Sequence, residues 1–133
     1  MNSLEGKIAS VHVHGNLSLV EVETGGGIVK SVVIETPDTA DYLSAGESIT
    51  ILFKETEVVV GKRMDAEVSI QNRLSCTLMA IERGKLLSRL KMQCSAGEIT
   101  SIITTQAVDQ LKLEEGDTVV AMIKTNEVML SHI

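Results

Sequence analysis

The sequence predicts an all-β protein built from two tandem units, each with five strands and one short helix. Three observations support this prediction. Apolar residues make up 44% of the 133 residues and aromatic residues only 2%, so Val, Ile, Leu and Met must fill the interior. Short β-branched runs alternate with glycine-containing turns. The second half also repeats the pattern of the first at an offset of seventy residues.

Three strands are expected at the start of the first unit. Residues 6–13 form a β-branched run that ends at the turn Gly15-Asn16, and residues 17–23 form the next strand. Gly25-Gly26-Gly27 then reverses the chain into a third strand at 28–34. A phosphate-binding loop would end in Lys-Ser or Lys-Thr and lead into a helix. A strand follows these glycines instead, which indicates a hairpin turn.

The rest of the first unit predicts one short helix and two more strands. Pro37-Asp38 breaks the third strand, and residues 38–43 can form one or two helical turns before Ala45-Gly46. Apolar runs at 48–53 and 58–60 are the fourth and fifth strands. A helix between the third and fourth strands is typical of a five-stranded barrel of the oligonucleotide/oligosaccharide-binding (OB) type. We therefore predict two tandem OB-like barrels.

The internal repeat defines the two units. Shifting the chain by seventy residues superimposes the halves without a gap. The identical positions are Leu4/Leu74, Leu17-Ser18/Leu87-Ser88, Gly27/Gly97, Ser31/Ser101, Leu43/Leu113, Gly46/Gly116, Lys54/Lys124 and Glu57-Val58/Glu127-Val128. The predicted domains are 1–63 and 64–133, joined at 61–66 by a linker or the start of a crossover strand. Units this small bury little surface, so mutual packing or oligomerisation is expected.

Charge and hydropathy exclude several classes of protein. The net charge of −6 argues against nonspecific electrostatic binding of nucleic acid, which needs clustered Lys and Arg. The near absence of Phe, Tyr and Trp also removes the stacking platforms of a single-strand binder. No apolar run approaches the ~20 residues of a membrane span, and residues 1–10 do not resemble a signal peptide. A soluble, cytoplasmic protein with no membrane partner is expected.

Catalytic and metal-ligating patterns are absent from the sequence. Cys76 and Cys94 have no metal-ligand spacing, and without an export signal they are expected to be reduced core residues. His12 and His14 have no third ligand at a recognisable spacing, which favours a solvent-facing pair over a metal site. No nucleophile, base and orienting group can be assembled. We expect neither an enzyme, nor a metal site, nor a cofactor.

Polar side chains gather at three strand ends and suit a tetrahedral oxyanion. Hydroxyls, side-chain amides, backbone N–H groups and one ammonium together form a suitable donor set. The residues are Ser69, Gln71 and Asn72 before one strand, Ser101, Thr104 and Thr105 at the end of another, and Lys124, Thr125 and Asn126 after a third. The same Ser and Thr residues also suit helix caps and turns, which remains the alternative interpretation.

At this point the sequence resembles a known family. Ser69-Ile70-Gln71-Asn72-Arg73-Leu74 resembles the Ser-x-x-Asn-x-Leu opening of the molybdate-binding Mop (TOBE) domains. The resemblance continues through 81–84, 97–104, 111–117 and 121–129, and thus covers nearly all of the second half. The first half resembles the same domain more loosely. The resemblance implies a tandem protein similar to the cytoplasmic molbindins, forming a homo-oligomer, a trimer, with oxyanions bound between units.

The resemblance also implies particular ligand contacts. Carried over by position, the oxyanion contacts are Ser69, Ile70, Gln71, Asn72, Thr104, Lys124 and Thr125, with Lys54 as a secondary candidate. Many members of the family carry Arg where Gln71 stands, and some use a Ser where Ala107 stands. Gln donates hydrogen bonds but no charge, so this substitution bears on affinity and on the choice of anion.

The first half departs further from the family pattern. Ile34 and Pro37 stand where the second half has Thr104 and Ala107, and the chain start is too short for the full opening motif. Only Lys54 remains of the implied contacts. We expect the first half to be a scaffold, or to form the far wall of a neighbour's site.

Two functions of different classes follow from these observations. The first is non-enzymatic cytoplasmic binding of molybdate or tungstate for storage, buffering or sensing. The alternative is a ligand-free interaction module that regulates a transporter ATPase or a transcription factor by contact. Gln71 is the residue on which the choice depends.

Overall fold

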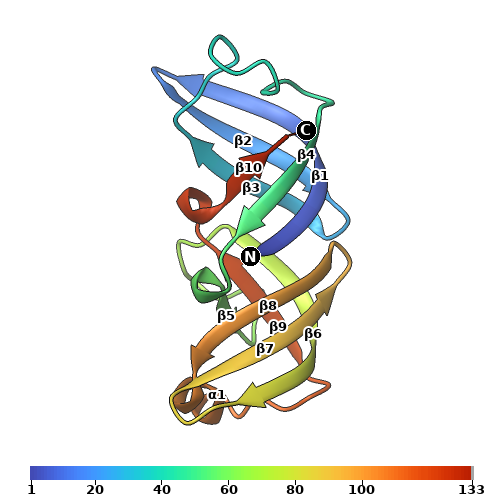
Figure 1. Cartoon of the computed structure of the whole chain (residues 1–133), viewed down its shortest axis with the longest axis vertical. Coiled ribbons are helices and arrows are strands. Elements are labelled where there is room, and N and C mark those ends of the chain that lie inside the picture. The colour runs from blue at the N-terminus through green and yellow to red at the C-terminus, as the bar shows by residue number, and fades with distance from the viewer. Residues whose placement is uncertain (133) are drawn as a thin grey trace.

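Two five-stranded antiparallel sheets stack along the long axis of the molecule, as the computed structural model of residues 1–132 shows (Figure 1). This arrangement confirms the predicted all-β class and the two tandem OB-like units. The elements are β1 (Asn2–His14), β2 (Leu17–Thr24), β3 (Gly27–Val33), β4 (Ser48–Phe53), η1 (Glu55–Glu57), β5 (Val59–Gly61), β6 (Asn72–Arg83), β7 (Leu87–Cys94), β8 (Gly97–Thr104), α1 (Thr105–Gln110), β9 (Thr118–Ile123), η2 (Thr125–Glu127) and β10 (Met129–Ser131).

Each sheet takes its fifth strand from the other half of the chain. The strand orders are β10-β4-β1-β2-β3 and β5-β9-β6-β7-β8. Met129 of β10 pairs with Leu52 of β4, and Val59 of β5 pairs with Met122 of β9. In Figure 1 the red strand β10 accordingly lies in the upper sheet and β5 in the lower one. The boundary between the two domains at residues 63 and 64 stays a prediction. Ile133 lies outside the residues that the structure describes.

The short helix predicted at 38–43 is wrong, because this segment forms only turns. In the second half, the Thr104 hydroxyl caps α1 by accepting a hydrogen bond of 3.0 Å from the Ala107 amide. Ile34 occupies the equivalent position and has no acceptor, and Pro37 has no N–H to donate. Proline also disfavours helical geometry in the residue before it. The first half therefore lacks both partners of the cap that begins α1.

Aliphatic side chains from both halves form one continuous hydrophobic cluster. On β4, burial alternates so that Ile49, Ile51 and Phe53 face the interior. Cys76 and Cys94 are free and buried in the same cluster, which confirms them as reduced core residues. Burial raises the pKa of the Cys76 thiol to about 12, with Cys94 beside it adding to the shift. This thiol is therefore protonated, and hence a poor nucleophile, at neutral pH.

Candidate functional site

The β6–β9 ladder brings most of the predicted binding residues to one end of the second sheet. Asn72, the first residue of β6, pairs with Ile123, the last residue of β9. In an antiparallel pair, the residue before one partner lies opposite the residue after the other. The ladder ends at this pair, and its register, continued by one residue, sets Gln71 across from Lys124. The segments that carry Ser69 and Ile70 on one side and Thr125 on the other continue from the same end of the ladder.

The polar side chains at this end are available to a ligand. Ser69, Gln71 and Lys124 are exposed, whereas Ile70 and Thr125 are half-buried. Within residues 1–132, the side chains of Ser69, Gln71 and Lys124 make no hydrogen bond or ion pair. Lys124 takes the N-cap position of η2 through its backbone, without using its side chain. A hydroxyl, an amide and an ammonium are thus without partners at the same end of the second sheet.

Asn72 has a different environment, because it is fully buried. Its Nδ2 donates to the carbonyl oxygen of Lys30 at 2.8 Å, and its Oδ1 accepts from the Lys30 amide at 2.7 Å. Lys30 belongs to β3 of the other sheet. This geometry argues for a structural role that joins the two sheets, in place of the predicted direct contact between Asn72 and an anion.

Asn2 makes the same contact from the first half, and the sequence reasoning missed it. Its Nδ2 donates to the carbonyl oxygen of Thr100, and its Oδ1 accepts from the Thr100 amide, both at 2.8 Å. Asn2 lies seventy residues before Asn72, and Lys30 lies seventy residues before Thr100. The repeat offset was the signal that could have found this pair.

Thr104 lies at the opposite end of the second sheet. It is the last residue of β8 and pairs with Leu87, while Ser88 pairs with Arg83 at the far end of β6. Figure 1 shows α1, which follows Thr104, at the lower tip of the molecule, whereas the red connection from β9 to β10 lies at mid-height. One copy of the chain therefore does not bring Thr104 to Lys124.

Thr104 borders an apolar groove between the two edge strands of the second sheet, β5 and β8. The groove has a volume of about 520 Å³, and its lining includes Val59, Leu87, Ile103 and Leu111. Val59 is 45% exposed and Leu87 57% exposed, although both are aliphatic. The open strand edges and the apolar lining together make this face suitable for a protein contact.

The corresponding lysine of the first half has less favourable neighbours. Lys54 is exposed at the N-cap of η1, as Lys124 is at the N-cap of η2. The residue after it is Glu55, where the second half has Thr125. The Glu55 carboxylate is ion-paired with the N-terminal amine of Met1, and it replaces a hydroxyl donor with an acceptor. This substitution agrees with the expectation that the first half is a scaffold.

A carboxyl pair lies at the two 3₁₀ helices. The side chains of Glu57 in η1 and Glu127 in η2 hydrogen-bond to each other, and this bond is the largest cause of a raised pKa at Glu127. Desolvation and repulsion by Glu57 raise this pKa further, whereas Lys124 lowers it. Lys124 thus lies close enough to Glu127 for an electrostatic interaction between the two side chains.

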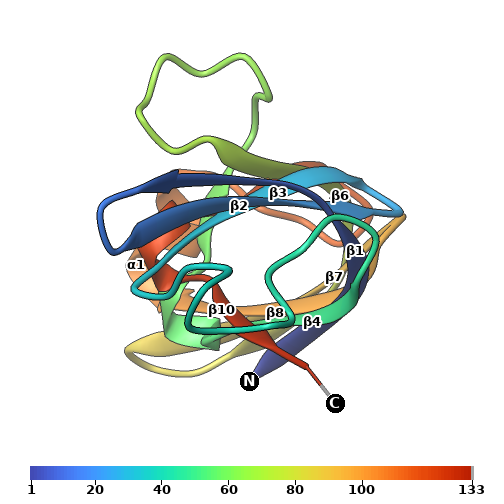
Figure 2. The same ribbon diagram turned by 90° about the horizontal axis from the view of Figure 1, so that it is seen from above.

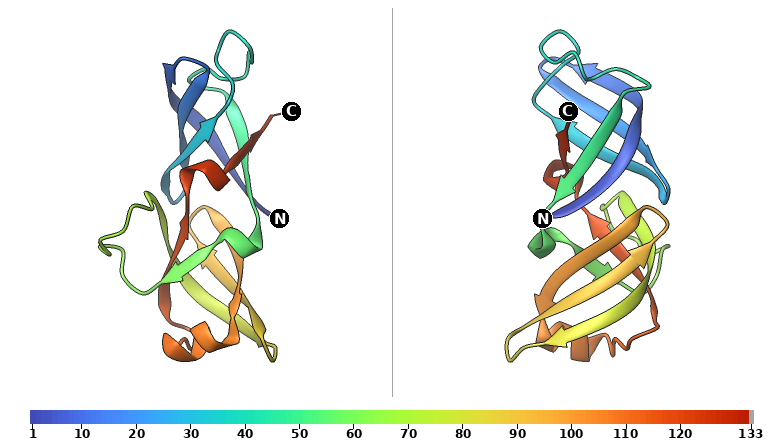
Figure 3. Two further views of the ribbon diagram at one scale, coloured as in Figure 1. Left: turned by 90° about the vertical axis from the view of Figure 1, so that its left-hand side faces the viewer. Right: turned by 45° about the vertical axis from the view of Figure 1, so that its right-hand side comes forward.

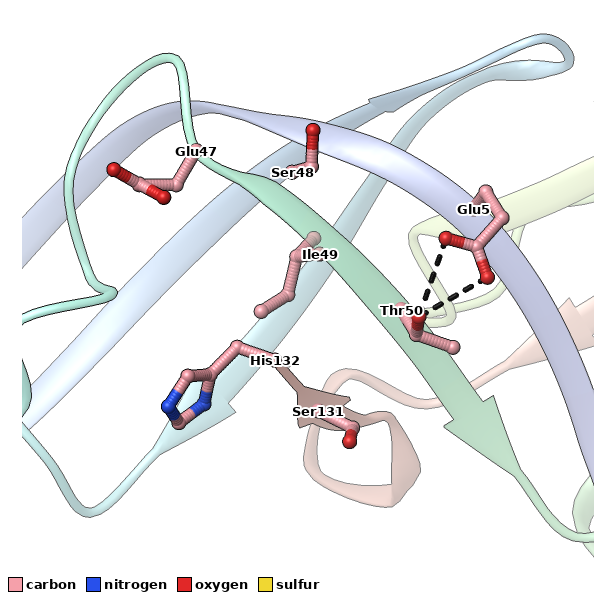
Figure 4. Close-up of a pocket in the computed structure, with 7 residues that line it drawn as sticks. All are labelled: Glu5, Glu47, Ser48, Ile49, Thr50, Ser131 and His132. Carbon is pink, nitrogen blue, oxygen red and sulfur yellow. Dashed lines mark hydrogen bonds between the residues drawn. The ribbon is translucent and has the colours of Figure 1, made fainter.

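A further pocket lies on the outer side of the first sheet (Figure 4) and has an acidic character. Its volume is about 200 Å³, and Glu5 and Glu47 are among its lining residues. The Thr50 hydroxyl donates to both oxygens of Glu5, at 3.0 and 3.2 Å. His132 also lines it and stacks on Tyr42 with ring centroids 4.1 Å apart. Two carboxylates make this pocket unsuitable for an oxyanion.

The remaining candidates show no metal-binding arrangement in the described part of the chain. No group of three or more His, Cys, Asp or Glu side chains there is placed to hold a metal ion. His12 and His14 are exposed, which confirms the expected solvent-facing pair. His12 lies 3.3 Å from the Ser10 hydroxyl and 3.6 Å from a Glu21 carboxylate oxygen. Among residues 1–132, no helix has the length and apolar character to cross a membrane.

The fold and the site together define a class: a tandem OB-like protein with free polar donors at one end of its second sheet. The TOBE domain family matches residues 1–60 and again residues 68–130, so the chain belongs to the TOBE domain family. Molybdenum-pterin-binding protein 1 of Clostridium pasteurianum is 30% identical over 64 residues, which are 47% of this chain and 94% of that protein. Molybdenum-pterin-binding protein 3 of the same organism is 28% identical over the same lengths.

A solved structure resembles the whole chain. It is a crystal form of the cytoplasmic molybdate-binding protein ModG with molybdate bound, at 27% sequence identity and a TM-score of 0.91. The likeness covers 99% of this chain and 96% of that one. Both halves are therefore part of the shared architecture.

Proposed function

We propose that this protein binds a tetrahedral oxyanion, molybdate or tungstate. The observation that carries the proposal is the end of the β6–β9 ladder at Asn72 and Ile123. Its register, continued by one residue, sets Gln71 across from Lys124, and both side chains are free of partners within residues 1–132. The similarity to molybdate-bound ModG over nearly the whole chain supports the same assignment. The contacts in this proposal are Ser69, the backbone at Ile70, Gln71, Lys124 and Thr125.

Short-range donors must provide the affinity, because the protein carries a net charge of −6. The Lys124 ammonium supplies one full positive charge, and Ser69, Gln71 and Thr125 supply neutral hydrogen bonds. Hydrogen bonds from a charged donor are about twice as strong as neutral ones. Lys124 is therefore the dominant contact, and Gln71 supplies direction without charge.

The complete site is formed between copies of the chain. Thr104 lies at the far end of the sheet from Lys124, so a Thr104 that contacts the same anion must come from a neighbouring copy. The apolar groove beside Thr104 provides a surface for that neighbour. We propose a homotrimer, as the family resemblance implies, with the first half of each copy acting as scaffold.

The role that fits these features is non-enzymatic storage, buffering or sensing of molybdenum in the cytoplasm. ModG is described as a cytoplasmic molybdate-binding protein, and the other relatives are molybdenum-pterin-binding proteins. Binding by exposed donors at a strand end, with no reacting group beside them, is suited to reversible capture and release.

Isothermal titration of the full-length protein with molybdate, tungstate and sulfate tests the proposal. We expect heat of binding and a rise in unfolding temperature with molybdate and tungstate, and a weaker response to sulfate. No heat and no thermal shift with any of the three anions would refute it. Native mass spectrometry with and without molybdate then gives the number of subunits and of bound anions.

The second candidate is a ligand-free interaction module that regulates a transporter ATPase or a transcription factor. The exposed apolar groove beside Thr104 and the absence of charge at Gln71 favour it. The substitution Gln71→Arg separates the two functions. If the natural protein does not bind oxyanions and Gln71→Arg does, the interaction module is the better description.

A further inference from the structure

The loop at 62–71, which ends in three of the proposed contact residues, stands out from the body of the protein (Figures 2 and 3). It follows β5, leads into β6 and has little hydrogen bonding of its own. Its internal backbone bond joins the Val68 amide to the Ala66 carbonyl at 3.0 Å. Arg63 and Asp65 form an exposed ion pair at 3.1 Å, a type that contributes little. The shape of the loop therefore depends on contacts from outside it.

Arg73 on β6 supplies those contacts. Its guanidinium donates four hydrogen bonds to backbone carbonyls of the loop. Nε donates to Ile70 at 2.8 Å, Nη1 to Met64 at 2.8 Å and to Ala66 at 2.6 Å, and Nη2 to Val68 at 2.8 Å. The acceptors are alternate residues, so the loop wraps around the cation with these four carbonyls turned inward. One side chain thus fixes most of the loop.

We propose that Arg73 is a positioning residue for the oxyanion site: it holds the 62–71 loop so that Ser69 and Gln71 lie beside Lys124. This inference rests on the oxyanion-binding function proposed above. Its physical basis is preorganisation, because a loop that is ordered before binding pays no ordering cost when the ligand arrives. The bond from Nε to Ile70 is the most direct part of this support, since Ile70 lies between Ser69 and Gln71.

Arg73 acts through the loop and makes no contact with the anion in this proposal. Four of its five N–H groups are committed to loop carbonyls. The role also requires the planar, forked geometry of guanidinium. A lysine ammonium carries the same charge but only three donors at a single point, so it cannot reach four carbonyls spread around the group.

The test compares Arg73→Gln and Arg73→Lys with the matched control Arg63→Gln in the full-length protein. Arg63 lies in the same loop but pairs only with Asp65, so its substitution removes the same charge without removing the carbonyl contacts. The readouts are the Kd for molybdate by titration calorimetry, amide hydrogen exchange across 63–71, and the unfolding temperature.

We expect Arg73→Gln to weaken molybdate binding at least tenfold and to speed exchange at 63–71 at least tenfold, with little change in unfolding temperature. Arg73→Lys should lose most of the affinity as well, whereas Arg63→Gln should bind within about twofold of the natural protein. Unchanged Kd in Arg73→Gln, full affinity in Arg73→Lys, or an equal loss in Arg63→Gln would each overturn the inference. If the natural protein does not bind molybdate, the proposed function fails, and the exchange rates alone decide whether Arg73 orders the loop.

Discussion

Asn2 and Asn72 make equivalent pairs of hydrogen bonds, each from its own half of the chain to the backbone of the other sheet. Asn2 bonds to the amide and carbonyl of Thr100, and Asn72 to those of Lys30, with all four distances at 2.7–2.8 Å. Two buried serines make a second symmetric set of bonds, which connect the halves of the chain within each sheet. Ser31 donates to the Val128 carbonyl at 2.7 Å, and Ser101 to the Val58 carbonyl at 2.8 Å. The asparagines thus join the two sheets, whereas the serines connect each exchanged strand to the opposite edge of its own sheet.

Replacing Asn72 with alanine is expected to destabilise the protein by about 2 kcal/mol, since a buried polar group left without its partner costs about 1–3 kcal/mol. The substitution leaves the Lys30 amide without its acceptor and the Lys30 carbonyl without its donor. Asn72 is fully buried at this position. Urea unfolding followed by circular dichroism measures the change. Asn126→Ala, at an exposed position in η2, is the control and should lie within about 0.5 kcal/mol of the natural protein. Equal midpoints for the two variants would contradict the structural role of Asn72.

Lys124→Ala is expected to abolish molybdate binding, whereas Lys54→Ala should weaken it little. Lys124 is followed by Thr125 and lies opposite Gln71, while Lys54 is followed by the carboxylate of Glu55. Removing the only full positive charge among the proposed contacts removes their strongest hydrogen bond. Titration calorimetry on both variants gives the comparison. Equal losses of affinity would show that the first half binds as well, contrary to its assignment as scaffold.

Stability should fall as pH rises through the pKa of Glu127. Its hydrogen bond with Glu57, desolvation and repulsion from Glu57 hold the folded pKa above the ordinary value of 4.5, against the effect of Lys124. A raised pKa means that the folded state binds this proton more tightly than the unfolded state does. The resulting stabilisation is present below pH 4.5 and is lost as pH rises through the folded pKa.

Urea midpoints measured from pH 4 to pH 7 test this dependence, with Glu127→Gln as the comparison. Glutamine keeps a hydrogen-bond donor but does not titrate, so the difference between the two proteins isolates Glu127. We expect the natural protein to lose stability relative to Glu127→Gln as pH rises over this range. Parallel pH profiles would show that the carboxyl pair does not influence folding.

The repeat made the strand content of both halves predictable, because periodic β-branched runs recur at the seventy-residue offset. Alignment of the two halves also explains why the first half lacks a helix. Ile34 and Pro37 replace the residues that form the cap at Thr104, and a local pattern of helix-compatible residues could not outweigh that loss.

The exchange of β5 and β10 could not be read from the sequence. Val59-Val60 and Met129-Leu130 are short apolar pairs that suit the edge of either sheet. Their partners are decided by the path of the whole chain, which places Val59 beside Met122 and Met129 beside Leu52. Local propensity carries no information about such a choice.

The candidate site was predicted as a set of residues but not as a geometry. The family resemblance pointed to Ser69, Gln71 and Lys124, which follow the same end of the β6–β9 ladder. The resemblance also pointed to Thr104, which the topology places at the far end of the same sheet. Arg73 occupies a variable position of the motif, and its four bonds to loop carbonyls depend on a loop shape that only the structure reveals.

The strand exchange also bears on how the protein is made. When the first half has been synthesised, β1 to β4 are available, but the strand that completes their sheet, β10, lies at residues 129–131 in the second half. The edge of β4 that pairs with β10 therefore stays unpaired until the second half has been synthesised. During that interval it is an unpaired strand edge, the feature most prone to joining the wrong chain. Rapid completion of translation thus protects this protein in a way that two independently folding domains would not need.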